Sequence, residues 1–284
     1  MYLLLLINLL FAPANSLQDS VLIRSAENPF FQGAVSMTTD GKGKIYVLDA
    51  VSNEIIKIDD RLNILGRVGR KGWNNGEFDA PTYIDGSSGL DIYVSDGKNY
   101  RLQRFDLNLS YISAIYTNTE TYPPALQYQT PIASVFVNPY LYLIDGDNNR
   151  IVVYPQSGAP FQSFGGFQSA ETPLIKPSKI IKDGYNSLYV LDRKKNSIFK
   201  FDNFGNYIRS VESDEIISIS IYNNTLFILT PDFVYAFDVK SNAFTAKLYL
   251  SEKINKNHIT DFLVYSLSKF YILERLKLSE FKLK

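Results

Sequence analysis

The chain has 284 residues with 29 basic and 29 acidic side chains, and this balance removes the simplest electrostatic argument for a nucleic-acid or acidic-membrane partner. The absence of cysteine excludes disulfides, thiol catalysis and thiolate metal ligands. Tyrosine (20) and phenylalanine (19) are abundant, which favours strands because aromatic side chains fit a pleated, half-buried surface.

The N-terminus is a short apolar segment, residues 1–12, followed by Pro13 and the small residues Ala14 and Ser16. This arrangement is typical of a signal peptide cleaved after Ser16, although no Lys or Arg precedes the apolar run. The run is shorter than the roughly 20 residues that span a bilayer. We therefore expect residues 1–16 to be a signal peptide and the mature protein to be secreted or periplasmic, without stable membrane insertion. The alternative is a buried N-terminal strand.

One short sequence motif recurs along the rest of the chain: an apolar residue, an aromatic residue, two further strand residues and an acid. The aromatic residue of each copy is 38 to 49 residues from the next. The six copies are Ile45–Asp49, Ile92–Asp96, Leu141–Asp145 and Leu188–Asp192, with degenerate copies at Leu226–Thr230 and Phe270–Glu274. Such a period suits one four-stranded unit of a repeat protein.

Each copy of this motif is flanked by further strand patterns and tight turns. A shorter apolar run lies about 10 residues earlier, and the turn between them contains Gly, Asn or Asp, which tolerate the positive φ of hairpins. Four antiparallel strands per repeat predict an all-β, six-bladed β-propeller over residues 17–284. The last repeat lacks a fourth strand, and Val21–Arg24 is a spare strand that we expect to close the ring and cover the exposed edge.

The repeats resemble NHL repeats. The first copy and its exit carry Asp49, Asn53 and Ile55 and then the segment Val68–Pro81, which contains four residues typical of the family loop, Gly69, Gly72, Gly76 and Phe78. Similar spacing follows Asp145 and Asp192, whereas the last two repeats lack the turn that runs from an acid to an Asn, and they lack the glycines. The resemblance implies a binding scaffold. Some cytoplasmic NHL propellers bind RNA, but the export signal argues against a nucleic-acid partner here.

The sequence offers little for catalysis. Its single histidine, His258, lies in a polar connection, and no nucleophile elbow, HExxH pair or phosphate loop occurs. We therefore predict no catalytic residue, no metal and no cofactor. The alternative is a metal-dependent hydrolase or lyase with a calcium-type site on the axis, as in six-bladed lactonases. The innermost strands offer Asp85 and Asp261, with Asp214 and Glu215 nearby; the others offer Ser36, Ser134 and Lys179.

The repeated acids Asp49, Asp96, Asp145 and Asp192 could be taken for a ring of ligands. Each ends a second strand and is followed within a few residues by Asn. A carboxylate in that position accepts backbone N–H bonds and holds the turn. We therefore expect these acids to be structural.

Basic and aromatic residues gather in the loops of one face, because turns between second and third strands lie on the same face as the connections between repeats. Long connections such as Tyr116–Tyr128 belong to that face, although covering a blade edge is an alternative role for it. The sequence predicts a monomer that binds a protein, peptide or glycan through this face, with an acidic ligand favoured by its charge. The expected binding residues are Arg70, Lys71, Trp73, Tyr100, Arg101, Arg150 and Arg193.

Overall fold

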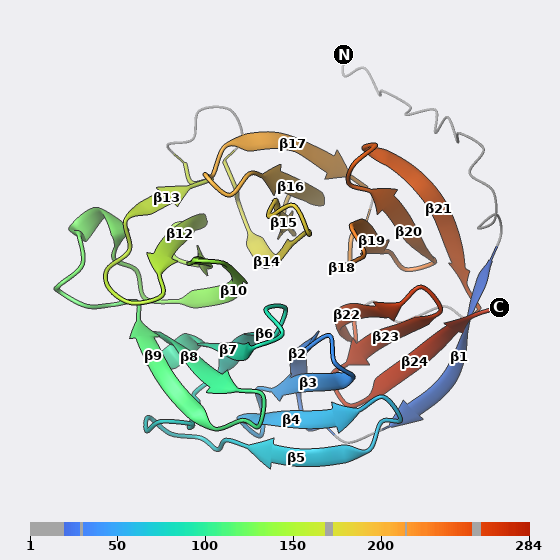
Figure 1. The fold of residues 1–284 in the computed structure, drawn as a ribbon, viewed down its shortest axis with the longest axis horizontal. Coiled ribbons are helices and arrows are strands. Elements are labelled where there is room, and N and C mark those ends of the chain that lie inside the picture. Colours follow the sequence, from blue (N-terminus) through green and yellow to red (C-terminus); the bar gives the residue numbers. More distant parts are fainter. Residues whose placement is uncertain (1–19, 29–30, 168–172, 214, 252–256) are drawn as a thin grey trace.

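The structure, a computed structural model, describes residues 20–28, 31–167, 173–213, 215–251 and 257–284. Within these ranges the strands form four four-stranded sheets and one eight-stranded sheet. Figure 1 shows the sheets standing in chain order around a central axis. The chain is therefore an all-β propeller. The expected signal peptide and its cleavage site lie outside the described residues.

The four-stranded sheets are antiparallel meanders that begin near the axis and end at the rim (Figure 1). The first two consist of β2 (Ala34–Thr39), β3 (Lys44–Asp49), β4 (Glu54–Asp59) and β5 (Ile64–Val68), and of β6 (Pro81–Asp85), β7 (Asp91–Asp96), β8 (Arg101–Asp106) and β9 (Tyr111–Tyr116). The next two consist of β10 (Pro131–Val137), β11 (Tyr140–Asp145), β12 (Arg150–Pro155) and β13 (Gln162–Phe164), and of β14 (Pro177–Lys182), β15 (Leu188–Asp192), β16 (Ser197–Phe201) and β17 (Tyr207–Glu212).

The eight-stranded sheet contains the remaining strands of the described chain. Its order is β18-β19-β20-β21-β1-β24-β23-β22. The strands are β18 (Ser218–Tyr222), β19 (Thr225–Leu229), β20 (Phe233–Asp238), β21 (Ala243–Leu250), β1 (Val21–Asn28), β24 (Leu278–Leu283), β23 (Lys269–Glu274) and β22 (Ile259–Ser266). The sequence predicted six separate sheets, and the structure instead joins the strands of the last two repeats through β1.

The closing role of the N-terminal strand is confirmed. β1 pairs antiparallel with β24, and Leu22 lies opposite Leu283. The sequence did not predict that β1 also pairs in parallel with β21, where Val21 lies opposite Tyr249. β1 therefore covers the free edges of both β21 and β24, which would otherwise expose unpaired backbone groups.

The core lies between neighbouring sheets, because alternate residues of a strand face opposite sides. In β3, Ile45 and Val47 pack with Tyr271 and other residues of the last sheet, whereas Tyr46 and Leu48 pack against the second sheet. The strand that carries the recurring apolar-aromatic-apolar motif is thus buried on both faces. This explains why the repeat signal is a continuous apolar run and not an alternation of apolar and polar residues.

Helix is confined to two 3-10 turns in the described part of the chain, η1 (Gly97–Asn99) and η2 (Pro124–Leu126). No helix among the described residues is long and apolar enough to cross a membrane.

Candidate functional site

Three of the four repeated acids, Asp49, Asp145 and Asp192, hold the turns that follow them, as the sequence predicted. Asp49 Oδ1 accepts the N–H groups of Val51 and Ser52, both at 3.0 Å, so it fixes the turn between β3 and β4. Its Oδ2 accepts Gln32 N–H at 2.6 Å and Gly33 N–H at 3.0 Å, which fixes the connection before β2. Asp192 makes the same two sets of bonds in its own sheet. These carboxylates are therefore structural, and none is free to bind a ligand.

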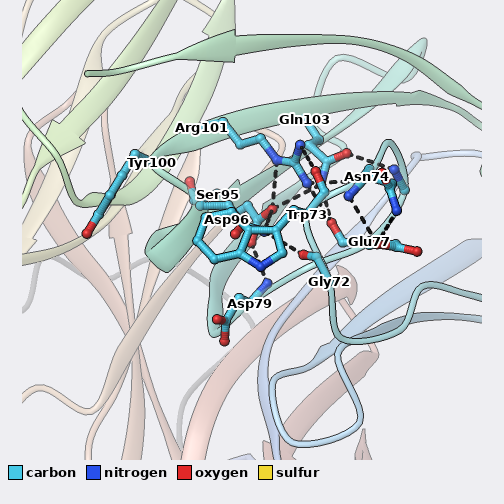
Figure 2. A network of polar contacts seen from close by, with 12 residues as sticks. Gly72, Trp73, Asn74, Glu77, Asp79, Ser95, Asp96, Tyr100, Arg101 and Gln103 are labelled. Atoms are coloured by element: carbon cyan, nitrogen blue, oxygen red, sulfur yellow. Dashed lines mark hydrogen bonds and ion pairs between the residues drawn. The ribbon is translucent and has the colours of Figure 1, made fainter. Parts of the chain in front are cut away.

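The second sheet departs from this pattern at Asp96. Its Oδ1 accepts Asp79 N–H at 2.8 Å, whereas its Oδ2 accepts three side chains, Asn99 at 2.8 Å, Arg101 at 2.9 Å and Gln103 at 3.1 Å. Both Asp96 and Arg101 are almost completely buried. Burial raises the pKa of Asp96, while these bonds act in the opposite direction. Figure 2 shows this pair at the centre of a polar network.

The network organises the connection between β5 and β6, residues 69–80, which we call the Trp loop. Arg101 donates to the carbonyls of Trp73 at 2.8 Å, Asn74 at 3.0 Å and Glu77 at 2.9 Å. Asn99 and Gln103 donate to two of the loop's carbonyls as well, Gly72 at 2.9 Å and Glu77 at 2.7 Å (Figure 2). A single buried guanidinium thus binds three loop carbonyls, which fixes the loop before any ligand arrives.

A carboxylate within the Trp loop completes its shape. Glu77 is buried and accepts Asn74 N–H at 3.0 Å and Arg70 Nε at 2.7 Å. The backbone N–H of Asn74 and the guanidinium of Arg70 lower the pKa of Glu77. The backbone is equally constrained, because Gly69 has φ +121° and a Cβ there would lie 2.5 Å from the Asn53 carbonyl oxygen.

Two aromatic side chains project from this rigid frame. Trp73 is 70% exposed although its carbonyl is held by Arg101, and Tyr100 is 38% exposed. Tyr100 has φ 53°, in the left-handed region, at the last residue before a third strand. The three other four-stranded sheets place an Asn there, at Asn53, Asn149 and Asn196. Left-handed backbone is unfavourable for a bulky residue, so Tyr100 carries backbone strain that the Asn residues at the equivalent positions reduce.

The other predicted binding residues are dispersed. Arg70 is largely exposed beside Glu77, and Lys71 is exposed on the same loop. Arg150 is mostly buried, pairs with Asp145 at 2.7 Å and donates to Ala125 O at 2.7 Å. The structure therefore brings together Arg70, Lys71, Trp73 and Tyr100, which we call the Trp73 surface. It assigns Arg101 and Arg150 to internal contacts, because Arg101 donates through all three guanidinium nitrogens and Arg150 through Nε and Nη1.

Arg193 is exposed, while its charged group is partly desolvated by the surrounding protein. Burial lowers the pKa of Arg193, while the charge of Asp261 acts in the opposite direction. Asp261 belongs to β22, one of the strands nearest the centre (Figure 1). Arg193 follows β15 in the fourth sheet and therefore does not belong to the loops of the second sheet that carry Trp73 and Tyr100.

The axis holds an ion pair. Lys179 Nζ of β14 lies 2.5 Å from Asp261 Oδ1 of β22, and both residues are buried. Asp261 also accepts Ser218 Oγ at 3.0 Å and Met37 N–H at 2.9 Å. A lysine ammonium thus occupies the position opposite the carboxylate that a calcium ion would need, and calcium prefers six to eight oxygen ligands. Within the described ranges, no three Asp, Glu or His residues lie close enough to hold a metal together.

Polar side chains also join the innermost strands of neighbouring sheets. Asp85 Oδ2 accepts Phe136 N–H at 3.2 Å, and Lys182 Nζ donates to Phe136 O at 2.7 Å. Burial raises the pKa of Asp85 and lowers the pKa of Lys182. Both side chains satisfy backbone groups of β10 on its unpaired inner edge. Their shifted pKa values are thus accounted for by a structural role. Of the other acids predicted near the axis, Glu215 is partly buried, and Asp214 lies outside the described residues.

Sequence reasoning missed Asn99, Gln103, Glu77 and the Lys179–Asp261 pair. A signal was present for Gln103: the third position of the third strand is Gln in the second repeat and apolar in the other three four-stranded repeats, at Ile56, Val152 and Phe199. Polar residues at positions that are apolar elsewhere in the repeat indicate a buried polar network.

Comparisons with known proteins show the fold. A streptogramin B lyase structure is 11% identical, with a TM-score of 0.62, over 93% of this chain and 97% of that chain. Virginiamycin B lyase from Staphylococcus aureus is 14% identical, with a TM-score of 0.62, over 91% of this chain and 99% of that chain. A catalytically inactive His-to-Ala variant of that lyase, bound to quinupristin, is 12% identical, with the same TM-score and coverage. No family model matches the chain, and no curated protein does. At these identities the similarity establishes a propeller fold and no more.

Proposed function

We propose that this chain is a non-catalytic, six-bladed, NHL-like propeller that binds a protein or peptide through Trp73, Tyr100, Arg70 and Lys71. The eight-stranded sheet counts as two blades that share β1. The observation that carries the proposal is Tyr100, which keeps a strained left-handed backbone next to the exposed Trp73. Strain of this kind persists where the surrounding structure enforces it, and it concentrates at functional sites.

The chemistry of the surface indicates the partner. Exposed Trp, Tyr and Arg side chains dominate binding hot spots, because each offers a large contact area with oriented polar or π interactions. Besides Arg70, the cations Lys71 and Lys98 are exposed in the loops that carry Trp73 and Tyr100. Arg70 is shared with Glu77, so the surface is only moderately basic. A peptide that carries an aromatic or apolar residue next to an acid matches this surface best.

The test uses mature protein, residues 17–284, to select peptides from a random display library. We expect enriched peptides to combine acidic and aromatic residues, and Trp73→Ala to weaken their binding about tenfold or more. Phe204→Ala is the matched control: Phe204 is also 70% exposed, but it lies in the turn between β16 and β17, at the opposite ends of the strands. Peptides that bind Trp73→Ala as tightly as the wild type would contradict the proposal.

Several observations support binding over the alternative, a hydrolase or lyase at the axis. The related virginiamycin B lyase is inactive in a variant with one histidine replaced by alanine. The single histidine of this chain, His258, is exposed before β22, and its carbonyl accepts Arg275 N–H at 3.1 Å. The axial carboxylate of Asp261 is neutralised by Lys179. Neither residue therefore offers a positioned imidazole or an unpaired carboxylate for catalysis at the axis.

We further propose that the protein is exported and begins at Leu17 after cleavage. The support is the apolar run in residues 1–12 and the small residues Ala14 and Ser16. Mass spectrometry of the N-terminus of protein from the exported fraction tests this proposal, and an intact Met1 on cytoplasmic protein would contradict it.

A further inference from the structure

A second surface, separate in chemistry from the Trp73 surface, lies between the second and third sheets at the rim. It is a groove of about 810 Å³, within the range of about 300–1,000 Å³ that is usual for ligand sites. One wall is β9 with the start of the β9–β10 connection, and the other is the turn between β12 and β13. The lining includes Ser113, Tyr116, Asn118, Thr121, Tyr122 and Gln156.

The groove exists because the third sheet has an incomplete outer strand. β13 has three residues and pairs only with Ile151, Val152 and Val153 of β12. The corresponding strand of the second sheet, β9, has six residues and pairs along the length of β8. The outer part of the second sheet therefore lacks a strand to cover it on that side. The turn at residues 156–159 lines the groove opposite β9.

The lining carries no charged side chain. All twelve lining residues are Ser, Thr, Asn, Gln, Tyr, Ile, Ala or Gly. Tyr116 is half exposed, and the side chains of Asn118, Gln156 and Ser157 make no hydrogen bond with the described residues. Free amides and hydroxyls both donate and accept hydrogen bonds. The groove thus combines aromatic faces with neutral groups of both hydrogen-bonding kinds.

A narrow extension leads from the groove toward the core. Ser113, Ile115 and Gln156 line both spaces, and Tyr93 and Arg104 line the extension. Its volume of about 10 Å³ is close to that of one water-sized probe. The Nε of Arg104 is buried and has no hydrogen-bond partner in the described part of the chain. One ligand oxygen in this extension would accept from that donor.

We propose that this groove binds a neutral oligosaccharide. A sugar ring has a C–H face that stacks on an aromatic side chain, and its hydroxyls donate and accept hydrogen bonds. A single hydroxyl also matches the size and the unsatisfied donor of the extension. A peptide fits less well, because peptide sites commonly use charged residues, apolar anchor pockets or a paired strand edge. Oligosaccharide binding here is independent of the function proposed for the Trp73 surface.

The experiment measures binding of neutral oligosaccharides of hexoses, pentoses and N-acetylhexosamines by calorimetry, with sulfated oligosaccharides as a comparison. We expect a neutral member to bind with micromolar to millimolar affinity and to weaken at least tenfold in Tyr116→Ala. Tyr116→Phe, which keeps the ring, should retain most of the affinity. Asn118→Ala combined with Gln156→Ala should also weaken binding, whereas Trp73→Ala should leave it unchanged.

Three outcomes overturn the proposal: no neutral oligosaccharide binds at millimolar concentration, the sulfated oligosaccharides bind more tightly than the neutral ones, or the Trp73-selected peptides lose affinity in Tyr116→Ala. Because the lining residues are at the surface, these variants should fold normally, and equal melting temperatures check this. Failure here with retained peptide binding would leave the proposed function intact.

Discussion

At the scale of single residues, the second sheet differs from the others at a few positions around Tyr100. Asp96 Oδ2 accepts Asn99, Arg101 and Gln103, whereas the corresponding oxygens of Asp49 and Asp192 accept backbone N–H groups. These side chains then hold carbonyls of the Trp loop, and the tyrosine stands where other sheets have Asn. These differences between the second sheet and the others depend on one another, because the side chains that replace the usual residues need the carbonyls of the Trp loop as hydrogen-bond acceptors.

Replacing Tyr100 with Asn should separate stability from binding. The left-handed conformation costs a bulky residue about 1–2 kcal/mol, and Asn tolerates it better. We expect Tyr100→Asn to raise the free energy of unfolding by about 1 kcal/mol, which corresponds to a melting temperature roughly 2–4 °C higher. Affinity for the selected peptides should fall. Asn149→Tyr, at the equivalent site of the third sheet, should destabilise by a similar amount, and a stable Asn149→Tyr would contradict the strain argument.

Trp73 is the only tryptophan in the chain, so its fluorescence reports the Trp loop directly. The pKa of Glu77 is lowered from 4.5, so its contribution to stability is fully present above pH 4.5 and is lost as the pH falls below that value. We expect Trp73 emission to change on acidification below pH 4.5, before the circular dichroism of the sheets changes. Glu77→Gln should remove this early transition. A fluorescence change that coincides with global unfolding would show that the loop is not held by Glu77.

At the scale of elements, β1 has more partners than the sequence indicated. Its pairing with β24 closes the last repeat, and its pairing with β21 joins that repeat to the one before. Leu22 is fully buried and packs with Leu248 and Phe281, whereas its neighbour Ile23 is 37% exposed. The alternation of burial along β1 provides a direct test of this closure.

Leu22→Ala should destabilise the protein by about 2–5 kcal/mol, because it removes buried apolar surface and leaves a cavity. Ile23→Ala, one residue along the same strand, should change the free energy of unfolding by less than about 1 kcal/mol. Denaturant unfolding of both variants measures the difference. Equal effects would mean that β1 does not dock as described.

At the scale of the whole molecule, the strands nearest the axis come from distant parts of the sequence. Lys179 and Asp261 are separated by 82 residues, and they join β14 to β22 past β18. Ser36, on β2, also bonds Asp261 at 3.2 Å. The ion pair therefore joins two innermost strands, β14 and β22, that are not consecutive around the axis, because β18 lies between them in chain order.

Lys179→Met should destabilise the protein by about 3–5 kcal/mol, because it leaves the buried carboxylate of Asp261 without a counter-charge. The double variant Lys179→Met with Asp261→Asn removes both charges and should recover most of the loss. Urea denaturation of the single and double variants measures the coupling. A single variant as stable as the wild type would show that water already solvates the axis.

The sequence by itself determined the repeat, the antiparallel strands, the turn acids and the closing strand. These features follow from local rules, because strand periodicity and turn chemistry act within a few residues. Only the tertiary structure decided that Arg101 is buried while Trp73 and Tyr100 are exposed, that Lys179 pairs with Asp261 at the axis, and that β1 also pairs with β21. Burial and charge pairing depend on which repeats meet in space, and residues such as Lys179 and Asp261 carry no local signal of one another. For the same reason the rim groove, which arises from the short β13 beside a complete β9, could not be predicted from the sequence of either repeat alone.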